Sequence, residues 1–188
     1  MSLQSNLAFV EPNDRPFRYL EAHAVGRTLT GDTVVWKLDV KTSRLTLSNP
    51  LGSLLHIGTA AKVVVRCSIA FLGYTRPYVV LEYIDNTRAI FTVDLEEEQP
   101  TLKSLDIDLD QYRDITLTYW RSMHKDKLIV TAIGEEGIYS GTLDAQDNLE
   151  MELFNRVEVR HPRREIHRVG VNVANQLQTE LVDIGTDQ

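Results

Sequence analysis

The fold is decided by a stretch that recurs three times along the chain: GDTVVWKLD at residues 31–39, NTRAIFTVD at 86–94 and EEGIYSGTLD at 135–144. Each copy places a polar turn before an apolar run that holds one aromatic residue, and each copy ends on an aspartate. The aromatic positions lie about 50 residues apart, a spacing that suits four-stranded antiparallel units. The repeat therefore predicts an all-β protein, although it names no chemistry.

The segments around these copies show the two-residue period of strands with one buried face. Val65, Cys67 and Ile69 alternate with Arg66 and Ser68, which places the first set toward a core. Similar runs follow through the third copy. Only residues 18–24 and 172–181 carry a helix signal, and the second segment alternates equally well as a strand. We expect one contiguous core built from eight side chains: Val65, Cys67, Ile69, Phe91, Val93, Ile115, Leu117 and Val130.

Composition narrows the classes of protein that the chain can belong to. Its 188 residues suit one domain, and we divide them into an N-terminal arm at 1–16 and a single all-β domain at 17–188. The net charge of -7 argues against a general nucleic-acid binder. One cysteine permits no internal disulfide, and no apolar run is long enough for a membrane-spanning helix. We expect a cytoplasmic protein, with a secreted domain as the alternative.

Two architectures are compatible with repeated meander units. The first is an antiparallel two-sheet sandwich, and the second is a set of propeller-like four-stranded blades in a partial or small propeller. The runs at 78–85, 91–95, 112–117 and 127–130 resemble the middle of a laminin G-like domain, which is a concanavalin-type sandwich. Residues 35–42 are similar to a kelch or related propeller strand. The first resemblance implies the sandwich, and the second implies blades.

Acidic and metal-ligand patterns give no metal site. Asp106, Asp108 and Asp110 have the alternate spacing that begins a calcium loop, but the glycine and glutamate that such a loop requires are missing. We interpret this run as a strand with a charged outer face. His161 and His167 flank a proline at a spacing that is poor for zinc. The sequence therefore predicts neither a metal nor a cofactor.

Two features could bind a partner. Trp120, beside Arg121, falls on the outward phase of its strand, where an exposed tryptophan next to an arginine would form an interface anchor; the alternative is that a second layer covers it. Residues 156–168 hold five arginines against two glutamates, which could grip carboxylates or instead pair with the protein's own acidic side chains. The candidate binding residues are Trp120, Arg121, Arg156, Arg160, Arg163, Arg164 and Arg168.

The favoured hypothesis is a non-enzymatic binding module that presents a sheet face and loops to a protein or a glycan. The arginine cluster favours an acidic protein surface over a glycan, and it contains no aromatic residue on which nucleic-acid bases could stack. One alternative is an enzyme that acts on a glycan through Glu82, Asp85 or Asp94. The other is a structural subunit of a larger β assembly.

Overall fold

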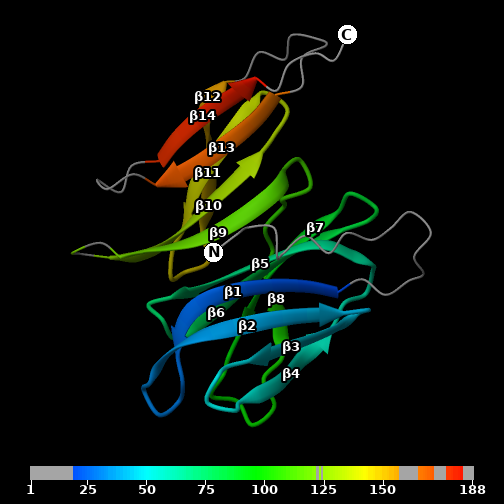
Figure 1. Ribbon diagram of the computed structural model, residues 1–188, viewed down its shortest axis with the longest axis vertical. Helices are drawn as coiled ribbons and strands as arrows, with labels where there is room; N and C mark the ends of the chain where they lie inside the picture. Colours follow the sequence, from blue (N-terminus) through cyan, green and yellow to red (C-terminus); the bar gives the residue numbers. More distant parts are fainter. Residues whose placement is uncertain (1–18, 122, 124, 157–164, 172–176, 184–188) are drawn as a thin grey trace.

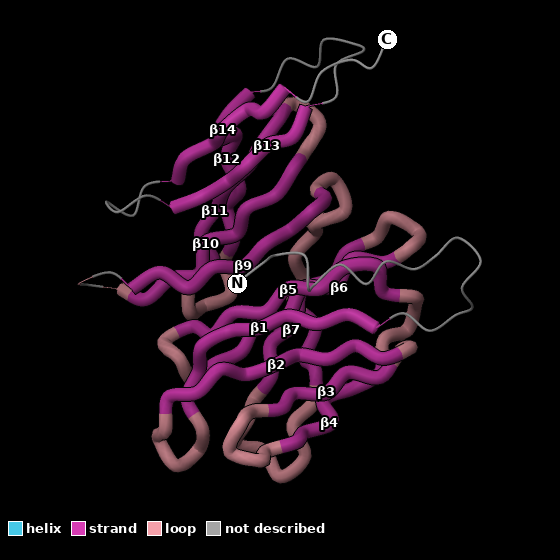
Figure 2. Tube along the Cα trace, in the orientation of Figure 1, coloured by secondary structure: helices cyan, strands magenta, loops and turns pink. Residues whose placement is uncertain are grey.

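The computed structural model describes residues 19–121, 123, 125–156, 165–171 and 177–183 (Figure 1). Every regular element among these residues is a β-strand, and all strand pairs are antiparallel (Figure 2). The all-β prediction of meander units is therefore confirmed. The proposed arm at residues 1–16 lies outside the described part of the chain.

Three four-stranded meanders follow one another, and a two-stranded hairpin comes after them. Sheet I contains β1 (Tyr19–Arg27), β2 (Thr33–Lys41), β3 (Arg44–Ser48) and β4 (Leu54–Thr59). Sheet II contains β5 (Val64–Leu72), β6 (Arg76–Tyr83), β7 (Arg88–Val93) and β8 (Leu102–Ser104). Sheet III contains β9 (Arg113–Arg121), β10 (Asp126–Ile133), β11 (Gly137–Leu143) and β12 (Leu149–Arg156), and the hairpin contains β13 (Glu165–Val171) and β14 (Leu177–Asp183).

Sheet II lies between the other two sheets and is buried on both faces. Ile69 and Phe71 of β5 pack into a core shared with sheet I, whereas Ala70 and Leu72 of the same strand pack into a core shared with sheet III. Successive side chains of a strand point to opposite faces, so both phases of β5 must be apolar. Each neighbouring pair of sheets packs face to face as in a sandwich, and the third sheet extends the stack as successive blades do.

The expectation of a single contiguous core is wrong in one respect. Ile69 and Val93 belong to the core between sheets I and II, with Cys67 and Phe91 packed against it, whereas Ile115, Leu117 and Val130 belong to the core between sheets II and III. Val65 is 37% exposed. The register of β5 against β6 shifts between Val64 and Arg66, and this irregularity turns Val65 out of the alternation.

Two segments differ from their predicted secondary structure. Residues 18–24, which carried the helix signal, overlap β1, in which Ala22 pairs with Leu38 and Ala24 with Trp36. The aspartate run at 106–110 is an extended connection between β8 and β9 and not a strand. Its Leu109 is buried in the core between sheets II and III. In both places tertiary packing decides the backbone conformation.

Side chains of sheet II fix the position of sheet III. β9 is an edge strand of its sheet, so part of its backbone lacks a strand partner. The Glu82 carboxylate accepts the N–H groups of Asp114 and Ile115 at 2.9 and 3.0 Å, and the Ser68 hydroxyl oxygen accepts the N–H of Leu117 at 3.0 Å. Glu82 and Ser68 are both buried. Their hydrogen bonds therefore fix the position of β9 against sheet II.

Candidate functional site

Three grooves lie at one end of the sheet stack. In a four-stranded meander the first and third turns lie at the same end, and here the first and third turns of all three sheets line neighbouring grooves. The backbone N–H of Arg27 donates to the carbonyl of Tyr74 at 2.6 Å, which joins sheet I to the β5–β6 turn. The rings of Tyr74 and Tyr119 meet edge to face, which joins that turn to sheet III.

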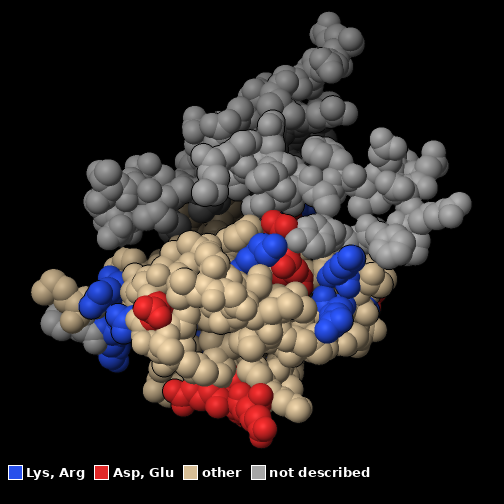
Figure 3. Space-filling model, turned by 60° about the horizontal axis from the view of Figure 1, so that its bottom comes forward, with Lys and Arg blue, Asp and Glu red and all other residues tan. Residues whose placement is uncertain are grey.

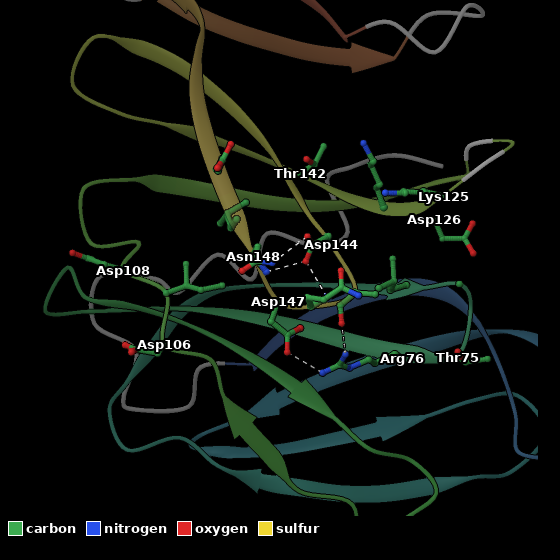
Figure 4. Close-up of a pocket in the computed structure, with 18 residues that line it drawn as sticks. Thr75, Arg76, Asp106, Asp108, Lys125, Asp126, Thr142, Asp144, Asp147 and Asn148 are labelled. Carbon is green, nitrogen blue, oxygen red and sulfur yellow. Dashed lines mark hydrogen bonds and ion pairs between the residues drawn. The ribbon is translucent and has the colours of Figure 1, made fainter.

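One of these grooves, which we call the seam groove, opens between sheets II and III and encloses about 1280 Å³. It is lined by the β5–β6, β9–β10 and β11–β12 turns and by the connection at residues 106–108. In Figure 4, Asp106 and Asp108 stand on one side of the groove, and Lys125 and Asp126 stand on the other. The groove thus brings together polar side chains that are distant in the sequence.

The β11–β12 turn forms one wall of the seam groove and is held in place by sheet II. The Tyr78 hydroxyl donates to Asp147 at 2.6 Å. Figure 4 shows the Arg76 guanidinium in contact with the same carboxylate, at 3.1 Å, and with the carbonyl of Ala145, at 3.3 Å. Burial, together with the bond to Asp147, raises the pKa of Tyr78. The phenol therefore stays a neutral donor at ordinary pH.

A second aspartate, Asp144, stabilises the same turn through hydrogen bonds within the turn. Asp144 accepts the backbone N–H groups of Gln146 and Asn148 at 2.9 and 3.0 Å. These bonds, and above all the one from the Asn148 N–H, lower the pKa of the Asp144 carboxyl, because they favour the ionised form. Asp144 and Asp147 are consequently occupied in shaping the wall of the groove.

Other charged groups of the seam groove remain available to a ligand. Within the described part of the chain, Asp106 and Glu150 form neither a hydrogen bond nor an ion pair through their side chains. The lining holds six carboxylates against three basic side chains. Across the described residues no group of His, Cys, Asp and Glu is arranged to hold a metal ion. The arrangement can bind a polar ligand and favours a cationic one.

A smaller groove, which we call the Trp36 groove, lies beside sheet I and encloses about 540 Å³. It is lined by the β1–β2 and β3–β4 turns and by the loop between β7 and β8, with Trp36 among its lining residues. The indole Nε1 of Trp36 is buried and has no hydrogen-bond partner within the described residues. A buried donor without a partner costs on the order of 1–3 kcal/mol, so such groups are uncommon in folded proteins.

The structure describes only some of the residues of the predicted binding site. Trp120 is half-buried on the face of sheet III that points away from sheet II, and its Nε1 is buried without a hydrogen-bond partner in the described residues. Arg121 is exposed at the end of β9. Arg156 and Arg168 fall within β12 and β13, although their side chains lie outside the described part, as do Arg160, Arg163 and Arg164 entirely.

The three carboxylates considered for glycan chemistry are kept apart. Glu82 is buried and binds the backbone of β9, with Arg66 and Arg88 beside it at 3.1 and 3.6 Å. Asp85 lies in the β6–β7 turn, whereas Asp94 follows β7 at the other end of that strand. The structure therefore gives Glu82 a structural role and does not bring the three carboxylates together.

The sequence analysis singled out Asp106 and Asp108 and the repeat that ends on Asp144, but it did not indicate that these residues line a common groove. Residues 144–148 have the composition of a turn, and that signal locates the turn correctly between β11 and β12. The partners of Asp147, which are Arg76 and Tyr78, lie in another sheet. No local pattern in the sequence encodes that contact.

Comparisons with protein-family models, with curated proteins and with solved structures gave no match. The laminin G-like and kelch-type resemblances therefore stay predictions. The described part of the chain contains no helix of the length and apolarity needed to cross a membrane.

Proposed function

We propose that the protein is a non-catalytic binding scaffold whose turn-bearing end receives a segment of a protein partner. The carrying observation is the seam groove, in which turns of two sheets converge around charged side chains, two of which, Asp106 and Glu150, have no side-chain partner among the described residues. Binding surfaces are commonly built on loops held by a rigid sheet framework. Here the framework is the double-sided burial of sheet II.

Charge favours a basic segment as the ligand. Carboxylates outnumber basic side chains in the seam groove, and Glu96, Glu97 and Glu98 follow one another in the β7–β8 loop at the same end. Figure 3 shows acidic side chains gathered at the lower edge of the surface. A surface potential of one sign steers partners of the opposite sign and lowers the affinity for like-charged ones.

The proposal is tested by titrating the full chain into a fluorescein-labelled lysine-rich peptide and a matched glutamate-rich peptide, with fluorescence polarisation as the measurement. Glu150→Lys reverses a charge in the seam groove that has no ion-pair partner among the described residues. Glu135→Lys makes the same change in the β10–β11 turn, at the opposite end of sheet III. We expect the lysine-rich peptide to bind more weakly as salt rises, and Glu150→Lys to weaken binding about fivefold.

The Glu135→Lys variant is the control for the test. Glu135→Lys should leave the affinity for the lysine-rich peptide unchanged within about a factor of two, because the opposite end is beyond a Debye length of ~10 Å at moderate salt. Binding of neither peptide, or equal binding of both, would contradict the proposal.

A second candidate function is a structural unit of a larger β assembly. It is favoured by the outer face of sheet I, where the cross-strand pair Val25 and Val35 is 46% and 48% exposed. Light scattering over a range of concentrations tests it, because self-association through that face should disappear in Val35→Lys. A monomer at every concentration would leave the binding scaffold as the sole proposal.

A further inference from the structure

The Trp36 groove combines exposed apolar side chains with an unpaired donor. Leu29 in the β1–β2 turn is 73% exposed, and Leu51 in the β3–β4 turn is 64% exposed. Both line the groove together with Trp36, which is only 3% exposed. Large side chains that cluster at a groove of about 540 Å³ have the size and character of a recognition pocket.

The part of the same groove that the β7–β8 loop lines is acidic. Glu96, Glu97 and Glu98 lie side by side in the β7–β8 loop, and all three are exposed. Lys103 pairs with Glu97 at 2.5 Å. The carboxylates of Glu96 and Glu98 form no ion pair within the described part of the chain. A bound cation would therefore find two carboxylates that the protein does not use itself.

We propose that the Trp36 groove binds a protein segment that carries a leucine-type side chain next to a lysine or arginine. The apolar side chain packs on Leu29 and Leu51, and the basic side chain contacts Glu96 and Glu98. The segment lies against Trp36, which lines the same groove. This inference rests on the proposed function and names the chemistry of the partner and its place of contact.

The apolar and the acidic contacts together are complementary to one ligand class. A nucleic acid or an acidic membrane surface would be repelled by the three glutamates. A purely basic segment would leave Leu29 and Leu51 in water, and a purely apolar segment would leave the carboxylates unpaired. A segment with both kinds of side chain satisfies each wall of the groove.

The test uses the full chain and three labelled peptides: a leucine/lysine peptide, a serine/lysine peptide and a leucine/glutamate peptide. Fluorescence polarisation should give the tightest binding for the leucine/lysine peptide. Leu29→Ser should weaken that binding about tenfold, because a leucine contact is lost. Leu54→Ser is the matched control, since Leu54 is 71% exposed but does not line the groove.

Two charge-reversal variants test whether the acidic residues of the groove, and not the charge of the whole protein, bind the peptide. Glu98→Lys should weaken binding of the leucine/lysine peptide about fivefold and flatten its dependence on salt. Glu135→Lys should change neither quantity. Both positions are exposed, so the folded state tolerates either change.

The Trp36 indole resonance gives a direct readout of whether the groove is occupied. In a nitrogen–proton correlation spectrum this resonance, assigned by comparison with Trp120→Phe, should shift when the leucine/lysine peptide is added, because Trp36 lines the groove. The serine/lysine peptide should shift it less. A resonance that stays in place at saturation would overturn the assignment of the peptide to this groove.

The outcomes distinguish the two proposals. If the leucine/lysine peptide binds and only Glu150→Lys weakens it, the partner occupies the seam groove, and the assignment to the Trp36 groove is wrong while the binding scaffold stands. If none of the three peptides binds, both proposals fail. If Leu29→Ser and Glu98→Lys weaken binding while Leu54→Ser and Glu135→Lys do not, the Trp36 groove is the site.

Discussion

Glu82 shows how one buried side chain holds two sheets together. Its carboxylate accepts two N–H groups of β9 and lies between the guanidinium groups of Arg66 and Arg88. The Nε atoms of Arg66 and Arg88 lie 3.1 and 3.6 Å from its oxygens and contact it as ion pairs, without a hydrogen bond from either Nε–H. A buried anion is tolerated only when opposite charges and donors surround it in this way.

Glu82→Gln is expected to destabilise the protein by about 3 kcal/mol, because the amide keeps the shape but leaves the arginines without their anion. Urea unfolding measures the loss. Glu135→Gln, at an exposed position without these contacts, should change the free energy of unfolding by less than about 0.5 kcal/mol. Equal stabilities of the two variants would show that Glu82 does not fasten sheet III.

At the scale of the element, the β6–β7 turn carries a pH-sensitive carboxylate. Asp85 accepts the hydroxyl of Thr87 at 2.5 Å and pairs with Lys62 at 2.7 Å. The Lys62 contact, followed by the Thr87 bond, lowers the pKa of Asp85 from 3.8 to about 2. The folded state therefore holds the charged form more tightly than the unfolded chain does.

A depressed carboxyl pKa gives stability that is present above the unfolded value and lost as the pH falls through the folded value. The Asp85 contribution should thus disappear between about pH 4 and pH 2. Asp85→Asn should flatten that part of a melting-temperature profile against pH, while the profile above pH 5 keeps its shape. An unchanged acid limb would mean that solvent screens the turn completely.

Period-two patterning was sufficient to predict most strands of sheets II and III, because their buried phases are regular. It failed for β1, where Leu20 and Ala24 lie at helical spacing but are only half-buried against sheet II. It also failed to separate two cores, since an apolar residue such as Val80 looks the same whichever neighbouring sheet it faces. The partner sheet is chosen by tertiary packing, which no local window contains.

The candidate site was harder to predict than the fold. Tryptophan and arginine residues attracted attention because their types are common at interfaces, yet the Nε1 of Trp36, which has no partner within the described residues, was invisible in the sequence. Groove walls come from turns of different sheets. Their meeting depends on the stacking of whole sheets, so only the structure could show it.

At the scale of the whole molecule, double-sided burial makes sheet II the most protected layer. Val79 and Leu81 of β6 face one core, whereas Tyr78 and Val80 face the other. Native-state hydrogen exchange should therefore find the slowest amides in β6, and the outer strands β4 and β8 should exchange earlier. Exchange of β6 at the rate of β4 would contradict the stacking of three sheets.

The attachment of β9 to sheet II also bears on aggregation. An edge strand with free N–H groups is a template for another chain, and proteins usually blunt it with charge, proline or a covering loop. Here the oxygens of Glu82 and Ser68 occupy three of those N–H groups from the side. A strand of another chain would have to displace two buried side chains before it could pair with β9. The hydrogen bonds that attach β9 to sheet II therefore also oppose fibril growth at this edge.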